Sequence, residues 1–436
     1  MSRAILWFRN DLRLNDNPAL DAAARECREI VPVYVLDERY LERGRWGFYR
    51  TGPYRLHFLL ESLYDLSEEL RSKGSRLLVV AGQPERELPR LAGEYGCSRI
   101  YASKEYAHEE IQAEKKLAAS FDIRFLHSST LYQPKELPFA IKQLPDVFTA
   151  FRKRVERYAE VSEPLVAPDE IPGPELPDTQ IPSLESLGFG LPPADGRAVL
   201  EFRGGATAAH SRLDHYFWNT ESLSVYKETR NGLIGADYSS KFSPWLANGC
   251  ISAREIYREV EAYEAEVEQN KSTYWLKFEL LWREYFRLVA MRYGQRIFYP
   301  GGIQEKAVRW KDNDKAFEKW RTGTTGDDFV DANMRELLFT GFMSNRGRQN
   351  VASYLAHHLK QDWRKGAAWF ESLLLDYDVY SNYGNWMYAA GVGNDPRSRV
   401  FNTGRQASIY DGDGAYRRLW LGEPEKDPAA FLERYF

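Results

Sequence analysis

The first third of the chain alternates short apolar runs with amphipathic stretches, and this pattern limits the possible fold more than any other feature. The apolar runs are AILWF (4–8), IVPVYVL (30–36), RLLVVAG (76–82), RIYAS (99–103) and IRFLHSS (123–129). The stretches between them have helical periodicity and lie near residues 18–27, 54–73, 84–95 and 108–120. Five strands joined by four helices predict a Rossmann-like α/β domain with a five-stranded parallel sheet, covered on both faces. Ligands of such sheets bind at the carboxyl ends of the strands.

The pattern changes after a proline-rich segment. Residues 164–193 hold eight prolines, which predict a stiff, extended linker. From about residue 200 the periodicity is helical, with long stretches at 252–269, 272–292, 331–339 and 347–360. Because 436 residues exceed what one hydrophobic core usually serves, two domains are expected. We predict an α/β domain at 1–130, a linker at 131–199 and an all-helical domain at 200–436.

Composition argues against several classes of protein. The three cysteines lie far apart and the seven histidines have no metal-ligand spacing, so we expect neither a disulfide framework nor a metal site. No apolar run approaches the ~18 residues of a membrane span. The N-terminus enters its first strand almost at once, leaving no room for a signal peptide, so a cytoplasmic protein is expected, by default a monomer. The formal net charge of −4 does not indicate nucleic-acid binding, although a local basic face remains compatible with it.

Residues 341–388 combine side chains that a plain helical core does not need. They read GFMSNRGRQNVASYLAHHLKQDWRKGAAWFESLLLDYDVYSNYGNWMY, with Trp and Tyr beside Asp, Asn and Arg. This mixture suits a pocket for a flat, polar-edged, redox-active ring. The 14% aromatic content, including 12 Trp, is also compatible with nothing more than a large helical core.

This segment resembles the flavin-binding core of the photolyase/cryptochrome family. GFMSNRGRQN together with DYD and NYGNW is similar to the DASH branch, and ILWFRNDLRLNDNPAL resembles the family's opening motif. The resemblance runs from residue 4 to about residue 421. It implies non-covalent FAD in the helical domain. A folate antenna, 5,10-methenyltetrahydrofolate, is implied between the domains.

The resemblance assigns the flavin-binding positions. Ser239, Ser240, Lys241 and Ser243 precede a predicted helix and form a suitable cradle for a pyrophosphate, although most such triplets are solvated turns and the residues alone favour that interpretation. In the family this position holds the flavin diphosphate, with Tyr226 beside it. Arg348 and Asp376 match an ion pair over the isoalloxazine ring, and Asp378 matches a residue at its polar edge. Asn382 matches the residue beside flavin N5. The remaining implied flavin contacts are Arg283 and Asn345.

Residues 275–289, WLKFELLWREYFRLV, predict a buried helix on which Glu279, Trp282 and Arg283 share one face. A core helix with a Glu279–Arg283 pair is the simpler interpretation. The resemblance instead implies that Glu279 hydrogen-bonds a pyrimidine lesion and stabilises its radical anion. Trp282 stacks on the flipped-out bases. Asn382 and Tyr388 complete the implied catalytic set.

Three further groups depend on the resemblance. Trp310, Trp363 and Trp386 match a chain that carries electrons from the surface to the flavin, where separate core tryptophans would be the default. Surface polarity alone would explain the DNA-contacting positions, which are Arg230, Trp282, Asn345, Arg346 and Gln406. Glu105, within KEYAHEE (104–110), follows the fourth strand and matches an antenna ligand. A surface helix start with an acidic cap explains Glu105 equally well.

The function implied is light-driven repair of cyclobutane pyrimidine dimers by electron transfer from reduced FAD, the reaction of a deoxyribodipyrimidine photo-lyase. The expected substrate is mainly single-stranded DNA, with weaker binding of duplex DNA. The alternative is a blue-light photoreceptor that binds nucleic acid and signals through flavin photoreduction. A flavin electron-transfer protein, which would need redox partners and no light, is a third reading.

Overall fold

The computed structural model describes residues 3–395, 400–422 and 427–436. Its N-terminal part is a five-stranded sheet in the order β3-β2-β1-β4-β5, with every neighbouring pair parallel. The strands are β1 (Arg3–Phe8), β2 (Glu29–Leu36), β3 (Leu78–Ala81), β4 (Arg99–Ser103) and β5 (Ile123–Leu126). The predicted sheet is confirmed.

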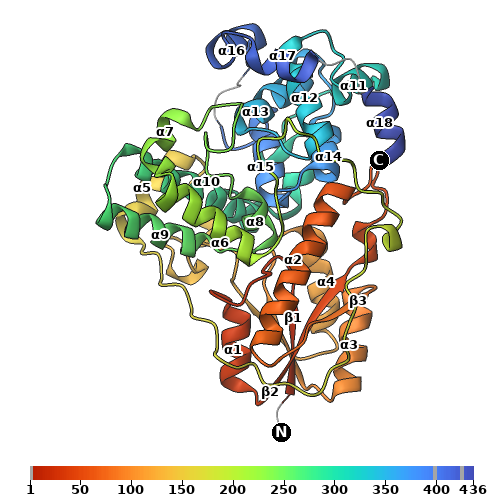
Figure 1. The fold of residues 1–436 in the computed structure, drawn as a ribbon, viewed down its shortest axis with the longest axis vertical. Coiled ribbons are helices and arrows are strands. Elements are labelled where there is room, and N and C mark those ends of the chain that lie inside the picture. Colours follow the sequence, from red (N-terminus) through yellow and green to blue (C-terminus); the bar gives the residue numbers. More distant parts are fainter. Residues whose placement is uncertain (1–2, 396–399, 423–426) are drawn as a thin grey trace.

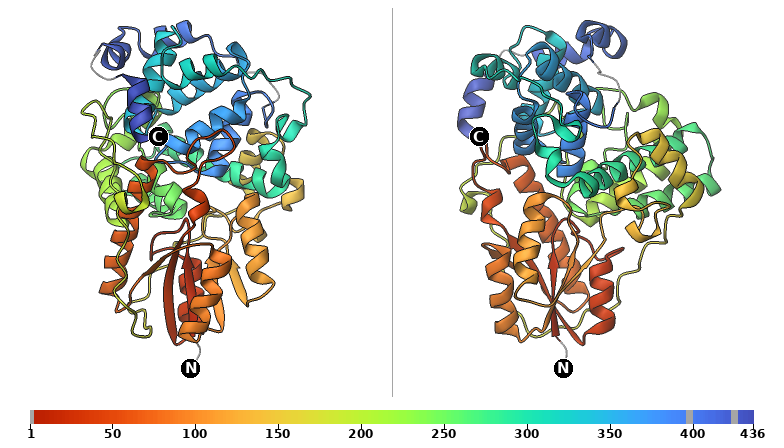
Figure 2. Two further views of the ribbon diagram at one scale, coloured as in Figure 1. Left: turned by 90° about the vertical axis from the view of Figure 1, so that its right-hand side faces the viewer. Right: turned by 180° about the vertical axis from the view of Figure 1, so that it is seen from behind.

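Helices lie on both sides of this sheet (Figure 2). They are α1 (Pro18–Glu26), α2 (Pro53–Ser72), α3 (Pro84–Tyr95) and α4 (His108–Ala118). Side chains alternate along β1, so Leu6 and Phe8 join a core shared with α1 and α2, while Ile5 and Trp7 join a second core under α3 and α4. The near-continuous apolar strands are therefore explained by burial on two faces.

The strand order reverses direction between β1 and β4, and such a switch point opens a crevice beyond the carboxyl ends of the strands. Arg9 and Asn10 follow β1 there, and Lys104 and Glu105 follow β4. This edge of the sheet faces the helical part of the molecule (Figure 1). The two structural units therefore meet where an α/β sheet usually holds its ligand.

The proline-rich segment runs along the α/β unit (Figure 1). Backbone hydrogen bonds tie it down, from Asp16 N to Leu165 O at 2.7 Å and from Ile30 N to Pro172 O at 2.8 Å. Before it, helix α5 (Phe148–Tyr158) packs against α10 of the helical unit. Helix α5 therefore lies within the predicted linker but packs on the helical unit. The linker bounds of 131–199 stay a prediction.

The rest of the described chain is largely helical. Its helices are α6 (Ala206–Asp214), α7 (Tyr226–Thr229), α8 (Ser243–Asn248), α9 (Ala253–Glu266), α10 (Lys271–Tyr293), α11 (Asp314–Arg321), α12 (Asp328–Thr340), α13 (Asn345–Ser353), α14 (Trp363–Leu373), α15 (Val379–Ala389), α16 (Thr403–Tyr410), α17 (Ala415–Leu421) and α18 (Pro428–Tyr435). The long α10 is central and contacts α5, α7, α9 and α15. Of the helices described, none has both the length and the apolar character that crossing a bilayer requires.

Candidate functional site

The predicted diphosphate cradle is a loop held rigid by an arginine. Arg212 of α6 donates to the carbonyl oxygens of Ala236, Ser239 and Ser240 at 3.0–3.2 Å. It also pairs with Asp237 at 2.7 Å. Ser243 begins α8 directly after this loop, and Tyr226 is buried in the neighbouring α7. The carbonyls of the loop are thus committed to Arg212.

Lys241 is a buried cation at the centre of the loop. Its backbone φ of +56° is rare for a non-glycine residue. Its Nζ atom lies 3.2 Å from the Tyr238 ring centroid and 3.4 Å from Ser239 Oγ, and no carboxylate among the described residues pairs with it. Burial, assisted by Arg212, lowers the pKa of Lys241 to about 7. A buried lysine without an acidic partner favours an anionic ligand such as a diphosphate.

The ion pair predicted between Arg348 and Asp376 is present. Arg348 Nη2 lies 2.8 Å from Asp376 Oδ2. Asp376 Oδ1 is buried and has no hydrogen-bond partner among the described residues. Asn382 is also buried, and its amide nitrogen donates to Ala367 O at 3.0 Å. That bond leaves the amide oxygen of Asn382 as the acceptor it offers to a ligand.

Asp378 combines two tasks at the start of α15. It caps the helix by accepting from Ser381 N at 3.1 Å and Ser381 Oγ at 2.5 Å. Arg287 of α10 pairs with both carboxylate oxygens, at 3.1 and 3.3 Å. Burial alone would raise the pKa of Asp378, but Arg287, Arg283 and Ser381 outweigh it and the pKa is lowered. Asp378 is therefore held as a carboxylate.

Glu279 pairs with Arg230 of the α7 C-cap, so the expected alternative of a Glu279–Arg283 pair is wrong. Arg283 instead donates to Ser129 O at 2.8 Å and Leu246 O at 3.1 Å. Glu279 and Arg283 are four positions apart and share one helix face. The guanidinium of Arg283 nevertheless donates to backbone carbonyls of neighbouring segments and not to Glu279. Burial raises the pKa of Glu279, and Arg230 offsets part of this rise.

Trp282 lies between two other aromatic rings. The ring of Phe148 stacks on it with a centroid distance of 3.7 Å and an interplanar angle of 8°. Tyr388 meets Trp282 edge-on at 5.9 Å and 84°. The structure thus brings together the predicted Trp282 and Tyr388, and adds Phe148 from the linker.

The three predicted tryptophans differ in burial. Trp386 and Trp363 are buried, whereas Trp310 is only partly buried. Trp386 Nε1 has no hydrogen-bond partner among the described residues. The Trp386 ring packs against Gly366, one turn from Trp363 on α14, where any Cβ would approach Trp386 Cη2 to 2.4 Å. Trp310 is thus the outermost of the three, whereas Trp386 and Trp363 are buried alike, so the order of the predicted chain stays a prediction.

Three of the five predicted DNA contacts lie on α13 and α16, whereas Arg230 and Trp282 lie at α7 and on α10. Arg346 donates to Asn231 Oδ1 at 2.9 Å, and its second terminal nitrogen lies 3.5 Å from Gln406 Oε1. The Arg346 guanidinium also covers the ring of Tyr410 at 4.4 Å. Asn345 is exposed at the first position of α13. Arg346 and Gln406 thus share one neighbourhood, while Asn345 faces solvent.

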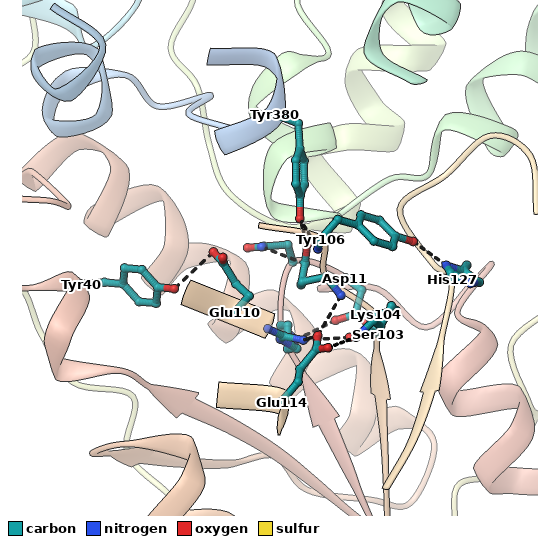
Figure 3. Close-up of polar contacts among 12 residues, drawn as sticks. Asp11, Tyr40, Ser103, Lys104, Tyr106, Glu110, Glu114, His127 and Tyr380 are labelled. Carbon is teal, nitrogen blue, oxygen red and sulfur yellow. Dashed lines mark hydrogen bonds and ion pairs between the residues drawn. The ribbon is translucent and has the colours of Figure 1, made fainter. Parts of the chain in front are cut away.

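A cleft of about 1110 Å³ lies between the two structural units. Tyr40 and Glu110 line it from the α/β unit, and Tyr380 and Tyr383 line it from α15. Tyr40 Oη donates to Glu110 Oε1 at 3.3 Å (Figure 3). Burial and the charge of Glu105 raise the pKa of Glu110 to about 7.

Glu105 is neither an exposed helix cap nor a free ligand of this cleft. It is 3% exposed, and α4 begins three residues later with Ala107 as its cap. Asn10 Nδ2 donates to one Glu105 oxygen at 3.1 Å and Tyr380 Oη donates to the other at 2.6 Å. The acidic-cap alternative is wrong because the carboxylate points into a buried network.

Several site residues were not predicted from the sequence. Arg212, Arg287, Phe148 and Tyr380 are separated from their partners by 25 to 275 positions. A lone arginine on an amphipathic helix has many possible partners, so nothing local marks Arg212 or Arg287. The aromatic residues around Trp282 are evident in the sequence. The ring that stacks on Trp282, Phe148, lies in the segment predicted to be linker.

Comparisons with known proteins agree with this geometry. Residues 275–436 match the model described as FAD binding domain of DNA photolyase, and residues 4–173 match the DNA photolyase model. A cryptochrome DASH of Gloeobacter violaceus is 50% identical over 426 residues, 96% of this chain and 85% of its own length. The cryptochrome DASH of Danio rerio is 50% identical over 430 residues, covering 96% of this chain and 83% of its own.

The crystal structure of a Synechocystis sp. cryptochrome matches with a TM-score of 0.94 at 46% identity, covering 100% of this chain and 91% of that chain. A class III photolyase of Agrobacterium tumefaciens matches with a TM-score of 0.83 at 30% identity, covering 99% and 89%. Fold, family models and site define a photolyase-type protein with an FAD-binding domain. The chain belongs to the DASH cryptochromes of the DNA photolyase family.

The described residues fit FAD. Lys241 supplies a buried amine 3.4 Å from Ser239 Oγ, and no carboxylate among the described residues pairs with it. Asp376 Oδ1 and Trp386 Nε1 are a buried acceptor and a buried donor without protein partners among the described residues. Unpaired buried polar atoms are costly, and a polar-edged ligand would satisfy them.

Proposed function

We propose that this protein uses light to split cyclobutane pyrimidine dimers, mainly in single-stranded DNA, as a deoxyribodipyrimidine photo-lyase. The observation that carries the proposal is the meeting of Glu279, Trp282 and Tyr388 around α10. A partly buried acid with a raised pKa lies one turn from an aromatic platform with an edge-on tyrosine. Bases stack on such platforms for roughly 1–3 kcal/mol each.

Reduced FAD, when bound, would supply one electron to the dimer on blue or near-UV excitation, and the return of that electron after ring opening would leave no net oxidation. Burial raises the pKa of Glu279, which favours the protonated acid that can donate a hydrogen bond to a pyrimidine carbonyl and so stabilise the added negative charge. Trp282 and Tyr388 frame the extruded bases. Asn382 offers its amide oxygen to N5 of the flavin.

The nucleic-acid side of the site is proposed to be formed by Arg230, Asn345, Arg346 and Gln406. Arginine can take a phosphate bidentately, which positions a strand without reading its sequence. The extrusion of a base costs least in DNA that is already single-stranded, which favours that substrate over duplex. We propose a cytoplasmic monomer, although the Arabidopsis thaliana relative is named chloroplastic/mitochondrial.

We propose that the interdomain cleft holds a folate antenna, 5,10-methenyltetrahydrofolate. Its volume of about 1110 Å³ is ample for a pterin with its side chain. Glu110 lines the cleft and has one hydroxyl partner at 3.3 Å, so its carboxyl can receive the amino and ring N–H groups of a pterin. Glu110 therefore replaces Glu105 as the proposed antenna ligand.

A blue-light photoreceptor that binds nucleic acid is the second candidate, favoured by the buried Trp386 and Trp363 and by the partly buried Trp310, which shares the Pro300 carbonyl with Trp363. Binding in the dark separates the two. A fluorescent single-stranded oligonucleotide with one thymine dimer, its undamaged twin and the matching duplexes are titrated with the flavin-loaded protein. Repair requires tighter binding of the damaged single strand, and this preference should be lost in Trp282→Ala. Equal binding of damaged and undamaged strands favours the receptor.

A further inference from the structure

Tyr380 joins the flavin-side helix α15 to the α/β unit. It lies in the first turn of α15, and in Figure 3 it points from the helical unit toward Tyr106. Its hydroxyl donates to Glu105 Oε2 at 2.6 Å and accepts from Tyr106 N at 2.8 Å. All of these groups are buried, so water cannot replace either bond cheaply.

Glu105 is fixed from the side of the sheet. Asn10, which follows β1, donates to its other carboxylate oxygen at 3.1 Å. The backbone N–H of Glu105 donates to Glu114 Oε1 at 2.9 Å, and Glu114 in turn pairs with Arg9 at 2.6 Å. Asn10 thus holds the carboxylate from the end of β1, and Glu114 holds the backbone of Glu105 at the end of β4. The Glu105 carboxylate is therefore a fixed acceptor for the Tyr380 hydroxyl.

Tyr380 is coupled to the proposed flavin edge on its other side. The guanidinium of Arg287 lies 5.0 Å from the centroid of the Tyr380 ring. The same guanidinium pairs with Asp378 at 3.1 Å, two residues before Tyr380. Asp378 caps α15, and Asn382 follows one helical turn later. A shift of Tyr380 therefore moves the cation that holds Asp378.

We infer that Glu105 is a positioning residue that fixes the first turn of α15 through Tyr380, so that the placement of Asp378 and Asn382 depends on the α/β unit. The inference rests on the proposed flavin site. It also agrees with the absence of Glu105 from the cleft lining, since both of its oxygens are hydrogen-bonded in the buried network, one to Asn10 and one to Tyr380. Tyr380 and Asn10, the two side chains that bond Glu105, also line the interdomain cleft.

Single-hydroxyl variants test this inference. Tyr380→Phe removes only the hydroxyl that Glu105 binds. Tyr106→Phe is the matched control, because its hydroxyl lies in the same cluster but bonds His127 Nδ1 at 2.6 Å and does not reach α15. Glu105→Ala removes the acceptor of the Tyr380 hydroxyl, and Glu105→Gln retains a carbonyl oxygen that can accept from Tyr380. The two readouts are amide hydrogen exchange across residues 379–382 and the dissociation constant of FAD from the full-length protein.

Tyr380→Phe and Glu105→Ala should both speed exchange in this turn and raise the FAD dissociation constant about tenfold, the usual effect of losing a hydrogen bond to a charged group. Tyr106→Phe should do neither, and Glu105→Gln should stay close to the parent protein. The inference is overturned if Tyr380→Phe leaves the FAD dissociation constant unchanged, or if Tyr106→Phe raises it equally. Absence of FAD binding by the parent protein would instead refute the proposed function.

Discussion

Trp310 and Trp363 donate their indole N–H groups to the same carbonyl oxygen, that of Pro300, at 3.0 and 3.1 Å. A carbonyl oxygen has two lone pairs and can accept both bonds. The shared acceptor holds the partly buried Trp310 beside the buried Trp363. The outer two members of the proposed electron chain are therefore neighbours in space, although 53 positions separate them.

This arrangement predicts the photoreduction behaviour of two variants. Oxidised flavin in the Trp363→Phe protein should no longer be photoreduced by an external thiol, because the middle step is lost. Trp310→Phe should be strongly slowed, since only the surface step is lost. Stopped illumination with flavin absorbance measures both. Trp420→Phe is the control, being equally buried but stacked on Arg197 away from this path. Normal photoreduction in Trp363→Phe would show that electrons do not reach the flavin through Trp363.

The Arg230–Glu279 pair predicts how repair depends on pH. Burial raises the pKa of Glu279 and Arg230 pulls it down, so Arg230→Gln should raise that pKa further. If the protonated acid assists repair, the rate falls as pH rises through this pKa. The fall should therefore move to higher pH in Arg230→Gln. Single-turnover repair at saturating oligonucleotide separates this effect from weaker DNA binding. A fall that moves to lower pH, or persists in Glu279→Gln, would contradict the assignment.

Lys241 predicts that flavin binding weakens at alkaline pH. Its pKa is lowered to about 7 by burial and Arg212, with Glu336 and Asp237 opposing. A bound diphosphate would raise this pKa again, so the complex holds one more proton than the free protein above pH 7. The affinity for FAD should therefore fall by up to about tenfold per pH unit above about 7, and level off below it. Lys241→Met should bind FAD weakly with a flat profile. Equal slopes in both proteins would place the titration elsewhere.

Phe148 predicts a contribution of the linker to lesion binding. Its stack fixes the plane of Trp282, and aromatic pairs are worth ~0.5–1.5 kcal/mol, so Phe148→Leu should weaken binding of the dimer-containing single strand about threefold to tenfold. Undamaged strands should bind as before. Phe151→Leu, one turn along α5 and packed on Tyr285, is the matched control. Loss of affinity for both strands, or an equal loss in the control, would mean that Phe148 only supports the core.

The sequence predicted the elements better than their contacts. Alternation and helical periodicity report burial along one segment, which is why the five strands and the helix carrying Glu279 were found. The Arg348–Asp376 pair was expected only because the family resemblance named it. The partner of Glu279 was not predictable by spacing, because Arg230 comes from another helix 49 positions away.

The role of Glu105 also depends on a contact that is distant in the sequence. Its place after the fourth strand correctly indicated the ligand edge of the sheet. Whether it faced the cleft or the interior depended on Tyr380, which lies 275 positions further along the chain. A tyrosine in an aromatic-rich helix gives no local sign that its hydroxyl is paired. Burial of Glu105 and exposure of Glu110 to the cleft are tertiary properties.

The most direct test of the account is dimer repair by the reduced protein. Chemically reduced, flavin-loaded protein is illuminated at near-UV to blue wavelengths with single-stranded and duplex oligonucleotides that carry one thymine dimer. Glu279→Ala, at a position that pairs with Arg230, is compared with Glu264→Ala, whose carboxylate pairs with Lys277 elsewhere. We predict light-dependent repair of the dimer, faster in the single strand; this repair should be abolished in Glu279→Ala and retained in Glu264→Ala. A dimer that survives in both substrates while the flavin photoreduces normally would contradict it.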